Sequence, residues 1–388
     1  MLQPPRSPWK RAAFQAIAPL VRVLQGSGRV SSAELAKIRN FLVLQYESPL
    51  GSVVHATPLF EALKRAMPDC HITVAASTIA ASVLHTNSYI DRCVVTPSPF
   101  RDLSASVRAV RAVLESTPKG ARCVITTIGN QRTRLVFLSL LVGSAVRVGY
   151  TLAPEFYDVP LVFEPERGQI GGNLDIVRSL GHPTPSYEPR VFFTRRDAER
   201  AAQWLAPLAA QLTAPRIVFV TQNSGGQRNQ WSPTRFQQVI STLSRATRAV
   251  PIFVGTERDA APIDELRREL PEKGISLAGK TTIAELAALL ARCDLIVSLD
   301  TGTFHVARAV RLPGVVIAPA WQSPLEWLPV QSQSYSVLHG PSIRDIPPDY
   351  SIDEVSVEQV CDAAQSLLRQ YPADPAQRTA RVERSLSD

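Results

Sequence analysis

Residues 300–305, Asp-Thr-Gly-Thr-Phe-His, combine side chains and backbone suited to phosphate oxygens. They lie between an apolar run, 295–299, and a helical pattern over 306–310. A glycine-containing turn from a strand into a helix presents free backbone N–H groups and the positive end of the helix dipole, which suits a diphosphate. Asp and Thr are also good N-cap residues, so a plain capped helix is the alternative. The candidate phosphate-binding residues are Asp300, Thr301, Gly302, Thr303 and His305.

A second polar segment, residues 221–233, follows the apolar run 217–221 and precedes a predicted helix that begins near Pro233. It is rich in glycine and small hydrogen-bond donors and contains one cation, a composition that suits anionic oxygens. A long surface turn would have the same composition. The candidate ligand-binding residues are Ser224, Gly225, Arg228 and Asn229.

A third segment, residues 47–58, follows the apolar run 41–45, and we expect a glycine-bearing loop that opens into a helix over 58–67. The sequence has no GxGxxG fingerprint and no Walker lysine motif, which disfavours a dehydrogenase or a P-loop enzyme. A fourth segment, residues 319–329, contains two tryptophans and three prolines. We expect it to form core or hinge packing near the ligand site.

The elements that position these segments alternate between apolar runs and helical patterns, which is typical of parallel sheets covered on both faces. The pattern occurs twice, with a proline-rich connection at 181–189 between the two halves. Ligands bind beyond the carboxyl ends of the strands in such sheets, which is where the polar segments fall. The predicted strands are 41–45, 71–75, 93–96, 123–128, 217–221, 251–255, 295–300 and 315–318.

Composition limits the class of partner. The chain has 388 residues, 45% hydrophobic and 20% charged, with a net charge of +8, which favours anionic ligands. The arginines are scattered among acids rather than gathered in a stripe, so we exclude nucleic acid as the partner. The five cysteines are widely spaced and form no CxxC pattern, so we expect buried free thiols and no metal site.

The N-terminal residues 1–39 are basic and amphipathic, and residues 1–30 hold five basic residues and no acid. Two readings stay open: a helix on an anionic membrane surface, or a helix packed on the protein itself. No apolar run approaches the roughly 20 residues of a membrane-spanning helix, and no signal peptide fits.

Taken together, these segments resemble glycosyltransferase family 9, the heptosyltransferases of lipopolysaccharide assembly. The most specific part is 277–305, which contains the Gly-Lys-Thr, the following helix and the D-[ST]-G-x-x-H turn. Residues 231–236 are similar to the family's W-P-x-x-R-F segment, and 324–327 to its P-x-x-W. Residues 50–58 are similar to its L-G-D-V loop.

The resemblance implies an α/β protein of the GT-B fold, with two Rossmann-like doubly wound domains facing a central cleft. It implies inverting, metal-independent transfer of a sugar, such as a heptose, from a nucleotide diphosphate sugar to a cell-envelope glycan or glycolipid. No cofactor and no metal are expected, and the sequence has no D-x-D pair. The expected location is the cytoplasm, at the inner face of its membrane. The expected parts are a basic segment 1–39, an acceptor domain 40–190, a nucleotide-sugar domain 191–345, a helix within 346–371 and a disordered tail 372–388.

Two departures from the family affect the mechanism. Ser52 occupies the position of the family's general-base aspartate, and Asn229 replaces a lysine. A serine hydroxyl accepts no proton near neutral pH without a base of its own, so Glu47 and His55 are the candidate replacements for the general base.

Two further residues are candidates for the donor site. Glu257 is a candidate to bind the nucleotide ribose and Lys280 to bind a phosphate, although both also fit solvated surface positions. A catalytically degenerate sugar-nucleotide or glycan-binding protein is the alternative function. An epimerase would need a nicotinamide fingerprint that is absent.

Overall fold

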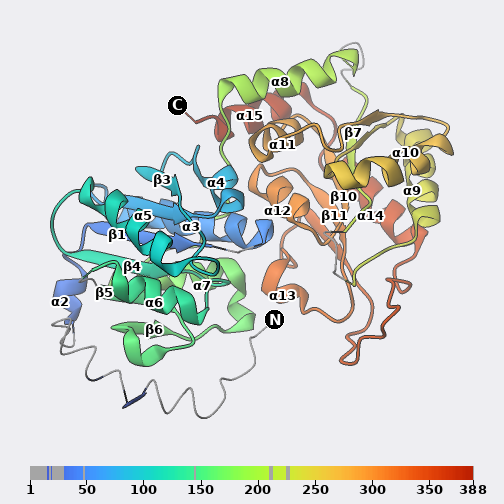
Figure 1. Cartoon of the computed structure of the whole chain (residues 1–388). Coiled ribbons are helices and arrows are strands. Elements are labelled where there is room, and N and C mark those ends of the chain that lie inside the picture. Colours follow the sequence, from blue (N-terminus) through green and yellow to red (C-terminus); the bar gives the residue numbers. More distant parts are fainter. Residues whose placement is uncertain are drawn as a thin grey trace. The chain divides into compact units, whose positions relative to one another are not determined.

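The computed structural model describes residues 15, 16, 19, 30–46, 49–143, 146–208, 213–223 and 228–387. Two compact units divide the chain, the first ending at Pro189 and the second beginning at Arg190 (Figure 1). Most of the predicted segment 1–39 lies outside the described residues, apart from the short helix α2, Ser32–Leu35. The predicted membrane contact of that segment therefore stays a prediction.

The first unit contains a parallel sheet with the strand order β3-β2-β1-β4-β5-β6. Helices α3, α4 and α7 pack together, while α5 and α6 form a separate pair whose apolar residues cover the sheet. The strands are β1 Asn40–Gln45, β2 His71–Ala76, β3 Arg92–Val95, β4 Arg122–Thr126, β5 Val146–Tyr150 and β6 Val159–Leu161. The helices are α3 Leu50–Ala66, α4 Thr78–Leu84, α5 Leu103–Glu115, α6 Thr133–Leu141 and α7 Gly168–Ser179, with short 3-10 turns η1 Pro154–Phe156 and η2 Pro165–Arg167.

The second unit repeats this architecture with the strand order β12-β11-β10-β7-β8-β9, again all parallel. Its strands are β7 Arg216–Val220, β8 Val250–Phe253, β9 Ile275–Ser276, β10 Leu295–Leu299, β11 Gly314–Ile317 and β12 Tyr335–Leu338. Its helices are α8 Arg195–Leu205, α9 Pro233–Thr247, α10 Ala260–Arg268, α11 Ile283–Leu290, α12 Gly302–Ala309, α13 Pro324–Trp327, α14 Val357–Gln370 and α15 Pro375–Ser385, with 3-10 turns η3 Ala206–Leu208 and η4 Glu257–Asp259.

Counted within each unit, both sheets have the order 3-2-1-4-5-6, the doubly wound arrangement of dinucleotide-binding domains. The order reverses between β1 and β4 in the first unit and between β7 and β10 in the second. Ligands bind at this switch point, beyond the carboxyl ends of the strands. The predicted polar segments at 47–58, 221–233 and 300–305 follow β1, β7 and β10, so all three begin at a switch point.

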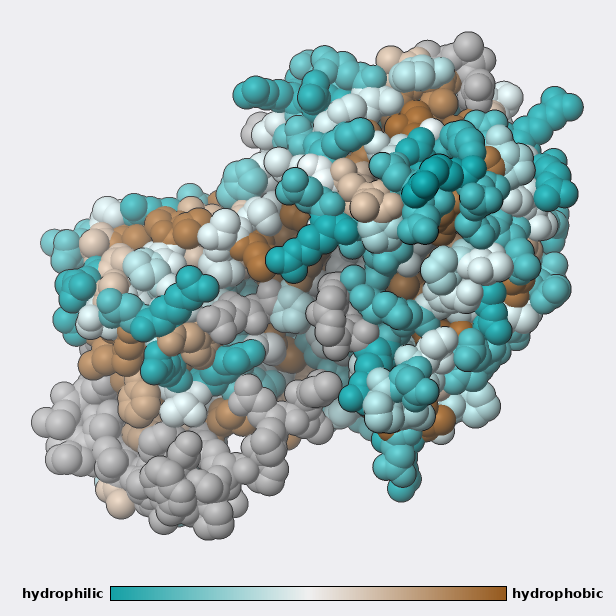
Figure 2. All heavy atoms as spheres, turned by 45° about the vertical axis from the view of Figure 1, so that its right-hand side comes forward, coloured by the Kyte–Doolittle hydropathy of each residue, from teal (hydrophilic) through white to brown (hydrophobic). Residues whose placement is uncertain are grey.

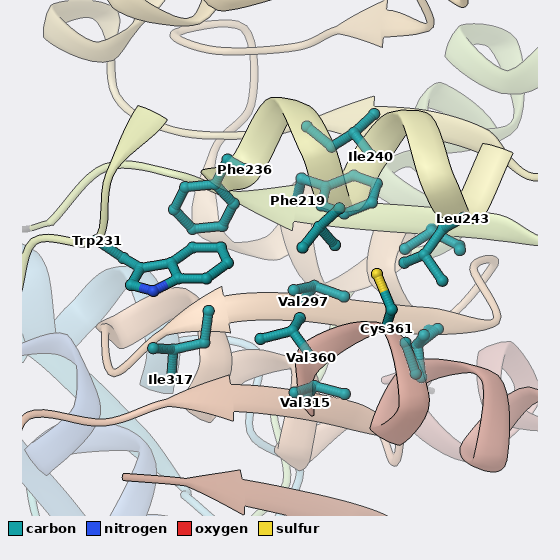
Figure 3. Packing of buried hydrophobic residues seen from close by; sticks show 14 of the residues in the cluster. Phe219, Trp231, Phe236, Ile240, Leu243, Val297, Val315, Ile317, Val360 and Cys361 are labelled. Atoms are coloured by element: carbon teal, nitrogen blue, oxygen red, sulfur yellow. The ribbon is translucent and has the colours of Figure 1, made fainter. Parts of the chain in front are cut away.

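The core of the second unit lies between its sheet and helices α9, α10 and α14. Figure 3 labels core residues from β7, β10, β11, α9 and α14. Trp231 packs edge-on against Phe236, with ring centroids 4.9 Å apart, and its indole N–H donates to the Val355 carbonyl. On the face shown in Figure 2, hydrophilic side chains predominate and hydrophobic ones form smaller groups. No helix in the described part of the chain combines the length and hydrophobicity that crossing a membrane requires.

The predicted helix start at Pro58 is wrong, because α3 already begins at Leu50 and Pro58 lies inside it. Proline lacks the N–H that would serve the Val54 carbonyl, four residues back. The Thr57 hydroxyl donates to that carbonyl instead, at 2.7 Å. Residues 51–63 are all buried, so tertiary packing compensates for the interruption. Ser52 and His55 are therefore helical residues and not loop residues.

The predicted disorder of 372–388 is also wrong, because residues 375–385 form α15. Arg378 in this helix makes a two-pronged contact with Asp294, at 2.9 and 2.6 Å, and both side chains are buried. Asp294 also accepts the backbone N–H of Arg216 at the start of β7. Arg378 thus anchors α15 to the amino ends of β7 and β10.

Candidate functional site

The turn after β10 has the geometry expected of an anion site. Thr301 is the N-cap of α12, with extended backbone and no capping hydrogen bond from its own side chain. The Thr301 hydroxyl is buried and has no hydrogen-bond partner among the described residues. The first-turn N–H groups of Gly302 and Thr303 have no acceptor within the helix, as at any helix start. An anionic oxygen at this turn would satisfy both kinds of donor.

A buried acid and an imidazole lie behind this turn. His305 Nε2 is 3.4 Å from Asp300 Oδ1, and the two side chains are 5% and 9% exposed. The Trp327 ring of α13 lies 6.1 Å from the imidazole, centroid to centroid. The structure thus brings Asp300, Thr301, Gly302, Thr303 and His305 together.

The segment after β7 reaches the same turn through Asn229. Its side-chain amide, 2% exposed, donates to the Asp300 carbonyl at 2.9 Å. Arg228 is exposed, and its guanidinium donates to two backbone carbonyls at 346–347, at 3.0 and 3.2 Å. Asn229 therefore braces the turn. Ser224 and Gly225 lie outside the described residues.

Glu257 and Lys280 lie further along the sheet edge. Glu257 is exposed and follows β8, the strand next to β7 on the side away from β10. Gly279, at φ +72°, packs so closely that a Cβ atom there would lie 2.8 Å from the Glu257 Cα. Lys280 is exposed and donates to the Ser276 carbonyl at 3.1 Å. Neither residue contacts the turn after β10 through a described hydrogen bond.

In the first unit, Ser52 is buried in the first turn of α3 and His55 follows one turn later. Asn173 of α7 donates to the His55 carbonyl at 3.2 Å and accepts from the Ile128 N–H at 3.4 Å. This fixes α3 against the segment that follows β4. The His55 side chain is 1% exposed, which favours a role in packing. Glu47 lies outside the described residues.

Sequence reasoning missed a buried network of uncharged side chains at the first switch point. Gln45, at the end of β1, donates to Thr127 and accepts from Asn130, both at 3.0 Å. Asn130 also accepts the Tyr46 N–H at 2.9 Å, so it joins the ends of β1 and β4. Burial raises the pKa of the Tyr46 phenol, whose hydroxyl lies against Thr96. The network gives this switch point neutral donors and acceptors.

Residues 140–338, just over half of the chain, match the family model described as glycosyltransferase family 9 (heptosyltransferase). The chain belongs to glycosyltransferase family 9. A lipooligosaccharide heptosyltransferase 2 of Haemophilus ducreyi is 29% identical over 158 residues. That alignment covers 37% of this chain and 45% of the relative, so the chain spans less than half the length of that relative.

Solved structures confirm the predicted fold. A family 9 glycosyltransferase from Veillonella parvula matches with a TM-score of 0.75 at 21% identity, over 86% of this chain and 98% of that one. The ADP-heptose lps heptosyltransferase II of E. coli matches with a TM-score of 0.67 at 17% identity, over 85% and 98%. This family 9 member therefore has the GT-B fold of those structures.

Proposed function

We propose that this chain transfers a sugar, with ADP-heptose as the first candidate donor, from a nucleotide diphosphate to a cell-envelope glycan or glycolipid. The observation that supports this most strongly is the turn after β10. There the N-terminus of α12 lies next to the buried Asp300–His305 pair, and the buried Thr301 hydroxyl has no hydrogen-bond partner in the part of the chain that the structure describes. The leaving diphosphate gains negative charge in the transition state. Fixed N–H donors at that position stabilise the transition state more than the ground state.

The second unit is the proposed donor side. Glu257 would accept hydrogen bonds from the nucleotide ribose, since it follows the strand that carries the ribose-binding acid in dinucleotide folds. Ser224, Gly225 and Arg228 would contribute further donors. Arg228 would have to exchange its backbone carbonyl partners for phosphate oxygens, so its share in binding is expected to be small.

The first unit is the proposed acceptor side, where neutral amides and hydroxyls suit a sugar alcohol. Glu47 is the only acid in the sequence between β1 and α3, and we propose it as the general base. Ser52 would orient the acceptor hydroxyl, and burial makes His55 the weaker candidate. The transfer is proposed to invert the sugar's configuration without a metal.

One observation favours a second function. The first turn of α3 carries Ser52 at the position where the resemblance to the family implies an aspartate. An acceptor hydroxyl would therefore find no base in that turn. A protein that binds a nucleotide sugar and transfers nothing would show the same donor site. The donor site alone does not separate the two functions.

A transfer assay separates them. The full chain is incubated with ADP-heptose and a truncated lipopolysaccharide, and ADP release and the mass of the acceptor are followed with and without EDTA. The transferase predicts an acceptor heavier by one heptose, unaffected by EDTA, with an inverted anomeric centre by NMR. Asp300→Ala is expected to abolish the product. Donor binding with no gain in acceptor mass, across several truncated acceptors, would support the binding protein instead.

A further inference from the structure

Three segments of the second unit are joined in a closed circuit of hydrogen bonds. The Trp321 indole N–H donates to the Arg228 carbonyl at 2.6 Å, and the Arg228 guanidinium donates to the carbonyls of 346–347. The Ile343 N–H donates to the Ala320 carbonyl at 3.0 Å, next to Trp321. We call these residues, 228, 320–321 and 343–347, the collar.

The collar joins the segments that follow β7 and β11, the two strands that flank β10. Residues 320–321 follow β11 and Arg228 lies in the segment after β7, while β10 is between those strands. Neighbouring strands are about 4.8 Å apart, so β7 and β11 are about 10 Å apart. The hydrogen bond from Trp321 to the Arg228 carbonyl shows that the segments following these two strands meet, and the adjacent Asn229 donates to the Asp300 carbonyl. The indole is therefore linked to the turn after β10 through Arg228 and Asn229.

Trp321 differs from the other anchored tryptophan of this unit. Trp231 is 2% exposed and packs in the core, and its indole N–H is held by Val355. Trp321 is held by its N–H in the same way, but its side chain stays partly exposed. A partly exposed aromatic side chain that is anchored by a hydrogen bond is a type of residue that lines ligand sites.

The position of Trp321 along the sheet edge indicates which part of the donor it meets. If the ribose lies at Glu257 beyond β8 and the diphosphate at the turn after β10, the ligand extends across the sheet edge from β8 through β7 to β10. The next strand in that direction is β11, which leads to Trp321. The group beyond the diphosphate is the sugar.

We propose that Trp321 is a specificity-determining residue whose ring packs against the sugar of the donor, and that its hydrogen bond to the Arg228 carbonyl holds the ring in place. This inference rests on the proposed function. It requires that Trp321 contributes to the affinity that the sugar adds to the donor, and that the affinity for the nucleotide diphosphate alone does not depend on Trp321.

The test is calorimetric titration of the full chain with ADP, ADP-heptose and ADP-glucose. Trp321→Ala is expected to weaken ADP-heptose about tenfold, as truncating a packed aromatic at a binding site does. Its affinity for ADP should change less than about twofold. Trp321→Phe keeps the ring but loses the N–H, so it should retain part of the preference for ADP-heptose over ADP-glucose. Trp204→Ala is the matched control, because Trp204 lies on α8, outside the collar.

The outcomes separate the two claims. If the unsubstituted protein binds none of these probes, the donor assignment fails and the role of Trp321 fails with it. If it binds all three and Trp321→Ala weakens ADP and ADP-heptose equally, or neither, the donor assignment survives and only the role of Trp321 is overturned. Melting temperatures of the variants show whether a lost affinity reflects misfolding.

Discussion

The two units share one strand order and differ in what they carry at the switch point. In the second unit, the turn after β10 combines a helix N-terminus with the buried Asp300–His305 pair. In the first, Gln45, Thr127 and Asn130 form a buried network without a formal charge. The same backbone arrangement thus carries a helix N-terminus with an acid–imidazole pair in one unit and uncharged amides and hydroxyls in the other, and we propose an anion site in the first case and a neutral polar site in the second.

This difference teaches that the strand order fixes where a ligand binds and the side chains fix what binds. A diphosphate requires donors that carry positive potential, and the N-terminus of α12 provides such donors at the second switch point. A sugar alcohol requires donors and acceptors of similar strength, which amides and hydroxyls provide. The proposed assignment of donor to one unit and acceptor to the other rests on this chemical difference between two equivalent positions.

The largest effect is expected at the amino ends of the strands, where the units also differ. In the second unit, Asp294 pairs with the buried Arg378. In the first unit, Asp91 accepts the Ile72 N–H and pairs with Lys64, which is more exposed than Arg378. Arg378→Met removes the ion-pair partner of a buried carboxylate and should cost about 3–5 kcal/mol of unfolding free energy. Lys64→Met should cost about 1 kcal/mol or less. Urea unfolding monitored by circular dichroism measures both, and equal losses would contradict the comparison.

The next largest effect is expected on turnover, when the proposed general base on the acceptor side is replaced. Glu47→Gln should lower kcat about a hundredfold or more, the usual contribution of a general base. The affinity for ADP-heptose should be unchanged, because the donor is assigned to the other unit. Steady-state kinetics and calorimetry measure the two quantities. A variant with full turnover would remove Glu47 from the mechanism.

A smaller effect is expected at Asn229, which acts through the turn it braces. Asn229→Ala removes the donor to the Asp300 carbonyl and should weaken ADP binding about five- to fiftyfold, the loss of one buried hydrogen bond. Asn229→Gln, which keeps the amide, should recover part of the affinity. Calorimetry with ADP measures both variants, and unchanged affinity in Asn229→Ala would mean that the turn is rigid without it.

The smallest effect is expected at Lys280. Its ammonium is exposed and bonds the Ser276 carbonyl, so Lys280→Ala should change the affinity for ADP less than about twofold. A tenfold loss would show that the ammonium leaves that carbonyl to bind a phosphate. The donor site would then extend from β10 to the loop after β9.

The sequence indicated the central strands well, because long apolar runs identify buried parallel strands. All eight predicted strands are present within a few residues of their predicted ends. The edge strands β6 and β9 were missed since they have three and two residues, and β5 and β12 because polar residues or glycine interrupt them. Short edge strands bury too few side chains to leave a pattern.

The candidate site was predictable where ligand-binding residues are contiguous, as in 300–305. It was not predictable where distant segments meet. Asn130 donates a hydrogen bond to Gln45, which is 85 residues away in the sequence. Trp321 donates one to Arg228, which is 93 residues away. The helical setting of Ser52 was missed because Pro58 and Gly51 normally argue against a helix. Burial of α3 by the rest of the unit overrides those local preferences.

The central claim is that the turn after β10 binds the diphosphate of a nucleotide sugar. Calorimetric titration with ADP-, GDP-, UDP- and dTDP-sugars tests it most directly, with Asp300→Ala as the disrupted site and Asp353→Ala, at an exposed aspartate of the same unit, as the matched control. The account predicts specific binding of one nucleotide class, lost in Asp300→Ala and retained in Asp353→Ala. Absence of heat with every nucleotide at millimolar concentration, or equal binding by Asp300→Ala, would contradict it.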